Sequence, residues 1–147
     1  MEDSARLDSE PGLRAMTTRV LSVDPGESRL GLAVSDPSRT IARPLKVLHH
    51  VSRVSDAQRI VETAGFEGVD TIVVGVAYDS RGEIGPQARR AHRLVAAIRQ
   101  AGFPRVETWD ESGSTEEALQ LHAGDEMTDA RAAAVILQGY LDAAKTT

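Results

Sequence analysis

Short apolar runs separated by turn residues fill the first third of the chain. Residues 20–23 and 30–34 are such runs, and Asp24-Pro25-Gly26 begins the turn between them, which predicts a β-hairpin. Residues 40–48 predict a third strand, and Pro44 within it suits the edge of a sheet because proline cannot donate to a strand ladder. Three antiparallel strands are therefore expected first.

The spacing of apolar residues then changes to a helical period. Ser55 as N-cap begins a predicted helix that ends at Gly65, and residues 71–74 predict a short strand of the buried parallel kind. Pro86 occupies a favoured first helical position, and the helix that it begins ends at Gly102. Opposite its apolar face, this helix carries the densest basic cluster of the chain, formed by Arg89, Arg90, Arg93 and Arg99. Such a cluster is more often a solvated face than a binding site.

The last part of the chain completes an alternating pattern. Residues 105–109 predict another strand, and Ser114 with Glu117 forms a capping box that starts a short helix. Thr128 is expected to cap the final helix, which carries a continuous apolar stripe. The element order β-β-β-α-β-α-β-α-α predicts an α/β fold. Its mixed five-stranded sheet would have three antiparallel strands followed by parallel ones, with helices on both faces.

Length and composition indicate one globular domain. The chain has 147 residues, of which 41% are hydrophobic and 27% are charged, values typical of folded proteins. Residues 1–18 are polar and aperiodic and predict a flexible N-terminal tail, so the folded domain is expected over residues 19–145. Met16 is an alternative start.

Charge and residue usage narrow the chemistry. Cysteine is absent, which excludes disulfides, thiolate nucleophiles and zinc–thiolate clusters. The net charge of −5 argues against coating nucleic acid by bulk electrostatics, but it leaves contact at a local site open. No apolar run is long enough to span a membrane and no signal-peptide core is present, so a cytoplasmic protein without a membrane partner is expected.

Three acidic residues stand where the predicted topology would bring them together. Asp24 ends the first strand, Glu111 follows the last strand, and Asp129 opens the final helix on its inward face. Carboxylates that meet at the carboxyl ends of parallel strands repel one another unless a divalent cation joins them. Oxygen ligands without His or Cys favour Mg²⁺ or Mn²⁺, ions that serve phosphate chemistry. Alternatively, Asp24 caps its own turn and Asp129 is satisfied by the amides of its helix.

Several short motifs occur in an order that resembles one known family. They are Asp24-x-Gly26, Gly-Leu-Ala-Val at 31–34, Ala-Arg-Pro-Leu at 42–45, Ile-Val-Val-Gly at 72–75, Asp110-Glu111 with Ser114-Thr115, and Asp129 with Ala132-Ala133. The chain is similar to the YqgF/RuvX family of the ribonuclease H-like superfamily, whose members are described as Holliday-junction-resolvase-like proteins and pre-16S rRNA nucleases. The resemblance covers about residues 19–142. It implies a ribonuclease H-like fold in which Asp24, Glu111 and Asp129 are the metal-binding catalytic acids.

The chain departs from the family pattern at three places. Ser112 follows Glu111 where an arginine is usual, and Asp79 replaces an asparagine in the loop after the fourth strand. The connection between Leu121 and Asp129 is short and lacks basic residues. These departures remove expected phosphate contacts while all three acids remain.

The leading hypothesis is a Mg²⁺- or Mn²⁺-dependent endonuclease that hydrolyses phosphodiester bonds in structured nucleic acid. The resemblance implies two substrates, precursor 16S rRNA and the Holliday junction, and a homodimer would place two sites across a junction. Asp36, Asp79 and Asp110 are open as a fourth metal ligand. Candidate contacts to the nucleic-acid backbone are Arg43, Arg81, Arg89 and Arg93, each of which is alternatively an ordinary surface charge.

Two other classes of function compete with the nuclease. A non-catalytic nucleic-acid-binding factor in transcription or ribosome maturation is favoured by Ser112 and by the altered loop around Asp79. Nucleotide binding through the Asp-x-Gly hairpin, as in the sugar-kinase and actin superfamily, is disfavoured. The chain is too short for a two-domain cleft and has no second phosphate loop.

Overall fold

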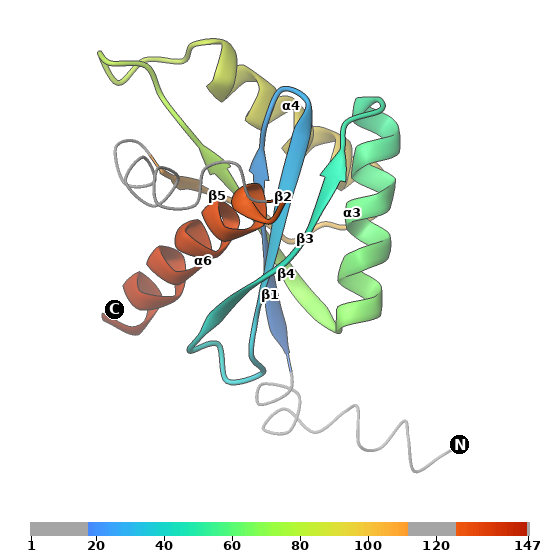
Figure 1. Cartoon of the computed structure of the whole chain (residues 1–147), viewed down its shortest axis with the longest axis vertical. Coiled ribbons are helices and arrows are strands. Elements are labelled where there is room, and N and C mark those ends of the chain that lie inside the picture. Colours follow the sequence, from blue (N-terminus) through green and yellow to red (C-terminus); the bar gives the residue numbers. More distant parts are fainter. Residues whose placement is uncertain (1–17, 112–125, 147) are drawn as a thin grey trace.

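A mixed five-stranded sheet forms the centre of the protein in the computed structural model, which describes residues 18–111 and 126–146 (Figure 1). Three strands pair antiparallel: β1 (Arg19–Pro25), β2 (Arg29–Ser35) and β3 (Ala42–His49). Two more, β4 (Val69–Val76) and β5 (Val106–Asp110), extend the sheet parallel to β1. The strand order β3-β2-β1-β4-β5 confirms the predicted topology and places Pro44 on an edge strand.

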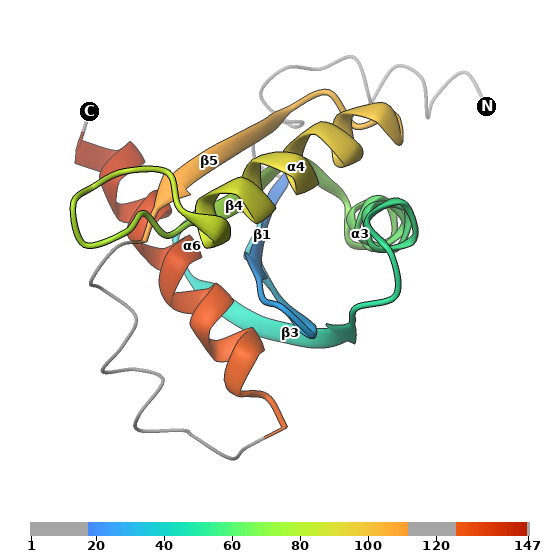
Figure 2. The same ribbon diagram turned by 90° about the horizontal axis from the view of Figure 1, so that it is seen from above.

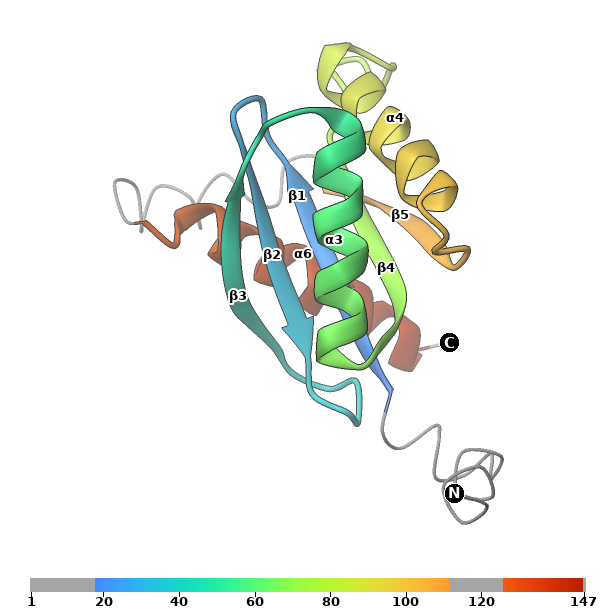
Figure 3. The same cartoon turned by 90° about the vertical axis from the view of Figure 1, so that its right-hand side faces the viewer.

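Helices cover both faces of the sheet, as predicted. Helices α3 (Arg53–Glu67) and α4 (Pro86–Gln100) lie on one face, and α6 (Thr128–Thr146) crosses the other (Figure 2). Figure 3 shows the same layers from the side, with α3 in front of the sheet and α6 behind it. Two apolar clusters fill the two interfaces, a larger one under α3 and α4 and a smaller one under α6. Among the described helices, none is long and apolar enough to cross a membrane.

The start of α3 differs from the sequence prediction. The N-cap is Ser52 rather than Ser55, because the Ser52 side chain accepts a hydrogen bond of 3.1 Å from the Ser55 backbone N–H. The helix also runs beyond Gly65 to Glu67, and Gly68, whose φ of 70° is left-handed, caps its end. The predicted first helical position of Pro86 in α4 is confirmed.

The third strand begins two residues later than predicted. The Asp36 carboxylate accepts the backbone N–H groups of Thr40 and Ile41, so these two residues belong to the loop before β3. The sequence also predicts a tail over residues 1–18 and a capping-box helix over residues 114–121. Apart from residue 18, both segments lie outside the described residues.

Candidate active site

Asp24 lies between two glycines at the carboxyl end of the central strand. It pairs with Gly31 of β2, and the parallel register of β1 with β4, which pairs Val23 with Val74, brings Gly75 to its other side. Successive side chains of a strand point to opposite faces. Ser22 donates a hydrogen bond of 2.7 Å to the Ala133 carbonyl of α6, so Asp24, two residues on, points to the α6 face as well.

Gly31 allows the beginning of α6 to rest directly on the sheet. A β-carbon at position 31 would lie 1.8 Å from the Asp129 carbonyl oxygen and 2.8 Å from the Ala130 nitrogen, distances that no side chain tolerates. This close approach of α6 to β2 therefore requires glycine at position 31. It places Asp129 near enough to Asp24 for the two carboxylates to repel each other.

Gly75 makes room for the third acid in the same way. The Glu111 backbone N–H donates to the Val76 carbonyl at 3.0 Å, which continues the β4–β5 pairing by one residue. A β-carbon at position 75 would lie 3.0 Å from Glu111 Oε2 and 2.7 Å from Ile136 Cδ1. The Glu111 carboxyl thus lies over Gly75, beside Asp24, and is buried with 9% of its surface exposed.

Burial and mutual repulsion raise the pKa of two of the three acids. Burial, followed by the charge of Asp129, raises the pKa of Asp24 to about 6. Burial, followed by the charges of Asp24 and Asp110, raises the pKa of Glu111 to about 8. The three predicted acids are therefore neighbours whose negative charges oppose one another. This charge is concentrated at the end of the sheet where β1 and β4 terminate.

Asp129 is engaged by a counter-charge. Its Oδ2 lies 2.9 Å from Nε of Arg29 at the start of β2. Within residues 18–111 and 126–146, no three His, Cys, Asp or Glu side chains already surround a point where a metal ion would sit. Joining all three acids to one cation would require the Asp129 carboxylate to turn from Arg29 toward Asp24.

Two of the three acids, Asp24 and Glu111, line a cavity of about 260 Å³ at the end of the sheet, and Asp129 is not part of its lining. Gly75 also lines this cavity, as do Gln87 and Arg90 from the first turns of α4. Arg90 is the functional candidate that sequence reasoning missed, because it was assigned to the solvated side of the helix. A signal was present: Arg90 lies one turn before the buried Leu94, at the border of the apolar stripe.

The four arginines predicted to contact nucleic acid do not line this cavity. Arg43 lies on edge strand β3, with its Nη2 3.9 Å from Oε1 of Glu67. Arg89 and Arg93 are exposed on α4, and Arg81 is exposed in the loop before it. Their contacts to nucleic acid stay a prediction.

The three candidates for a fourth ligand differ in their positions. Asp36 is used within its own loop, where hydrogen bonds from Ile41 N–H, the Ser38 hydroxyl and Thr40 N–H hold the pKa of its carboxyl well below the ordinary value. Asp79 accepts the N–H groups of Arg81 and Glu83 and lines a neighbouring cavity. Asp110 is close enough to Glu111 to raise its pKa.

One carboxylate lies on the central strand, a second follows the last parallel strand, and a third lies at the start of the helix that crosses the sheet. The mixed sheet that carries them has the ribonuclease H-like fold. The chain belongs to the RuvX family, described as Holliday junction resolvase, whose sequence profile matches residues 18–143. The family resemblance and the fold class predicted from the sequence are thereby confirmed.

Two relatives illustrate the similarity. A protein of Rubrobacter xylanophilus named "Putative pre-16S rRNA nuclease" is 41% identical over 133 residues, which cover 84% of this chain and 92% of the relative. A protein of the same name from Anaeromyxobacter sp. is 39% identical over 132 residues, with coverages of 84% and 96%.

Two solved structures share the fold. The RuvC protein of T. thermophilus, in complex with a Holliday junction substrate, aligns with a TM-score of 0.53 and 19% identity over 87% of this chain and 96% of that chain. The Fowlpox virus resolvase, in complex with Holliday junction DNA, aligns with a TM-score of 0.53 and 9% identity over 86% and 99%. At these identities the likeness concerns the fold alone.

Proposed function

We propose that the chain is a Mg²⁺- or Mn²⁺-dependent endonuclease acting on structured nucleic acid, with Asp24, Glu111 and Asp129 as its catalytic carboxylates. The observation that carries the proposal is that two of these acids, Asp129 and Glu111, each pack against a glycine, and these two glycines flank Asp24. Gly31 admits the backbone of Asp129, and Gly75 admits the carboxyl of Glu111. Such close approach costs electrostatic energy, which a bound cation would offset.

The donor set fits a hard divalent cation. All three side chains offer oxygen, and the pKa values of Asp24 and Glu111 are raised first by burial and then by the negative charge of neighbouring carboxylates. A bound cation would neutralise this charge and make a water molecule a better nucleophile toward phosphorus. Asp24 and Glu111 would hold the cation, and Asp129 would complete the site after leaving Arg29.

The chain's own residues would also position the phosphodiester. Arg90 and Gln87 line the same cavity as Asp24 and Glu111, so a phosphate group entering it meets hydrogen-bond donors as well as acids. A guanidinium binds phosphate oxygens through charge-assisted hydrogen bonds. Arg90 is therefore the proposed contact to the scissile phosphate, in place of the arginine that the family pattern carries after Glu111.

Two substrates follow from the comparisons. The names of the relatives support an end of precursor 16S rRNA, and the description of the family supports a four-way DNA junction. A homodimer would place two sites on opposite strands of a junction. Either substrate implies action in a bacterial cytoplasm.

The test is cleavage of a labelled precursor rRNA end and a labelled four-way junction with Mn²⁺, Mg²⁺ or EDTA. Wild type is compared with Asp24→Ala and with Lys46→Ala, which alters an exposed lysine on β3 outside the acidic cavity. We expect cation-dependent cutting in wild type and Lys46→Ala and none in Asp24→Ala. Cutting that persists in Asp24→Ala would rule out this site.

A non-catalytic nucleic-acid-binding factor is the second candidate. The Arg29–Asp129 ion pair favours it, because this pair holds one acid in a contact that needs no cation. This candidate predicts that wild type binds both substrates without cutting either, with or without Mn²⁺.

A further inference from the structure

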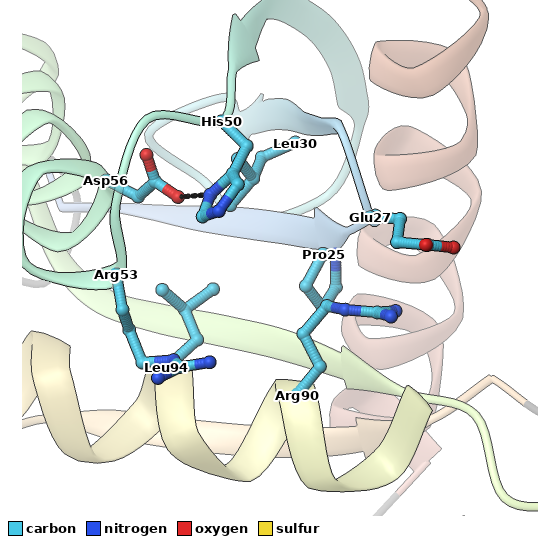
Figure 4. A pocket seen from close by; sticks show the side chains of 9 residues that line it. Pro25, Glu27, Leu30, His50, Arg53, Asp56, Arg90 and Leu94 are labelled. Carbon is cyan, nitrogen blue, oxygen red and sulfur yellow. Dashed lines mark hydrogen bonds and ion pairs between the residues drawn. The ribbon is translucent and has the colours of Figure 1, made fainter. Parts of the chain in front are cut away.

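A second cavity lies on the other face of the turn that follows Asp24. Its volume is about 70 Å³, and it is bounded by the β1–β2 turn, the beginning of α3 and the first half of α4 (Figure 4). Leu30 and Leu94, each 3% exposed, form an apolar floor. Figure 4 shows Arg53 from α3 and Arg90 from α4 reaching into the space between the helices and the turn.

The buried carboxylate of Asp56 orients His50, which lines this cavity together with Arg53 and Arg90. Asp56 is 2% exposed and accepts hydrogen bonds from Val51 N–H at 3.1 Å, from Arg59 Nη2 at 2.5 Å and from His50 Nδ1. Although burial opposes its ionisation, these donors hold the pKa of the Asp56 carboxyl below its ordinary value. The negative charge of Asp56 is thus compensated locally, and the His50 ring is oriented with its other nitrogen, Nε2, left for a ligand.

The two cavity arginines have no such compensation. Neither Arg53 nor Arg90 makes a hydrogen bond or ion pair with another residue in the described part of the chain. The second acid facing the cavity, Glu27, is exposed on the turn. Two arginines against one exposed glutamate leave a local positive charge on a protein whose net charge is −5.

Strand alternation joins this cavity to the acidic one. The pair Asp24–Gly31 faces α6, and the next pair along the hairpin, Pro25–Leu30, faces α3 and α4. Both cavities are lined by Pro25, Gly26, Glu27 and Arg90, so they adjoin across the turn. A chain of phosphates that enters the acidic cavity and crosses the turn therefore passes Arg90 and then Arg53.

We propose that Arg53 and His50 in this cavity bind a backbone phosphate of the nucleic-acid strand whose scissile phosphate lies at Asp24 and Arg90. This inference rests on the proposed function. The cavity offers donors and an apolar floor that strengthens their electrostatic attraction. A single water needs only about 10–15 Å³ of such space, so the cavity has room for a small polar group. It would hold the strand in register without reading its sequence.

The test measures binding by the full chain in EDTA, where cleavage does not occur. Fluorescence anisotropy with the labelled four-way junction and the labelled rRNA end is recorded over a series of salt concentrations for wild type, Arg53→Gln and Lys46→Gln. Lys46→Gln removes the same charge from an exposed position on β3 away from both cavities. We expect Arg53→Gln to weaken binding roughly three- to tenfold and to reduce the salt slope by about one unit, with Lys46→Gln near wild type.

The outcomes separate this inference from the proposed function. Equal affinities and salt slopes for Arg53→Gln and Lys46→Gln overturn the phosphate site, whether or not wild type cuts. Binding of inorganic phosphate is measured for the same variants. If Arg53→Gln loses phosphate binding but keeps its affinity for nucleic acid, the proposed strand contact is overturned as well, because the cavity would then bind a free anion. A slope reduced only in Arg53→Gln supports the site even if no cleavage is found. Absence of wild-type binding to both substrates overturns the phosphate site, whereas the proposed function is tested separately by cleavage with Mn²⁺ or Mg²⁺.

Discussion

Replacing Gly31 with alanine should displace the first turn of α6 and impair the acidic site. The added β-carbon would lie 1.8 Å from the Asp129 carbonyl oxygen and 2.2 Å from its carbon. Apolar contacts are comfortable only at about 3.5–4 Å, so the helix must retreat by roughly 1.5–2 Å. Behind it, Ala133, Leu137 and Leu141 would lose part of their packing on the sheet.

We therefore expect Gly31→Ala to lower the free energy of unfolding by at least about 1–3 kcal/mol, the usual cost of overpacking a core. Asp129 moves with the helix, and a displacement of about 1 Å can reduce an enzymatic rate by roughly a hundredfold. Urea unfolding followed by circular dichroism gives the first quantity, and the initial cleavage rate with Mn²⁺ gives the second.

Gly65→Ala is the matched control. Gly65 lies inside α3, and nothing lies within 4 Å of where its β-carbon would be. Alanine is a better helix former than glycine, so this variant should gain about 0.5–1 kcal/mol. If Gly31→Ala is as stable as wild type, the close packing of α6 on β2 is refuted, and with it the placement of Asp129.

Three further predictions follow from the charges. Because the pKa of Glu111 is raised, the folded protein binds more protons than the unfolded one between about pH 4.5 and 8. Without a cation, its free energy of unfolding should therefore fall as the pH rises through this window. Thermal melts of Glu111→Gln should show a flatter pH profile. Arg29→Gln should change stability by less than about 1 kcal/mol because the Arg29 side chain is 57% exposed. Its Mn²⁺ affinity by calorimetry should rise because Asp129 is released, and an unchanged affinity would contradict that role of the pair. Asp56→Asn should cost about 1.5–3 kcal/mol at neutral pH in urea unfolding, the usual worth of charged hydrogen bonds. Because the folded pKa of Asp56 is lowered, the loss relative to wild type should shrink as the pH falls below about 4.

The strands, the edge position of β3 and the start of α4 could be predicted because single residues and short runs of the sequence indicate them. Pro44 cannot donate to a ladder and lies on the edge strand, and Pro86 begins α4. Ser55 misled the prediction of α3 because two serines three residues apart offer equal caps. Ser52 is the N-cap because of contacts in the first turn of α3, such as that between Asp56 and His50. These contacts exist only in the folded chain.

The acids of the site were predictable, but the groups around them were not. Asp24, Glu111 and Asp129 stand at ends of elements, so topology alone brings them together. Which side chains of α4 face the carboxyl ends of the strands depends on how the helix is rotated about its axis where it packs on the sheet. For this reason Arg90, rather than Arg89, reaches the acidic cavity.

The most direct test of the three-carboxylate centre is a calorimetric titration with Mn²⁺ at pH 8 in two buffers of different ionisation enthalpy. Wild type should bind Mn²⁺ saturably and release protons, because the raised pKa of Glu111, about 8, leaves a large part of this carboxyl protonated until the cation arrives. Asp24→Asn should lose this binding, and Lys46→Gln should keep it. Binding of equal strength in wild type and Asp24→Asn, or none in wild type, would contradict the account.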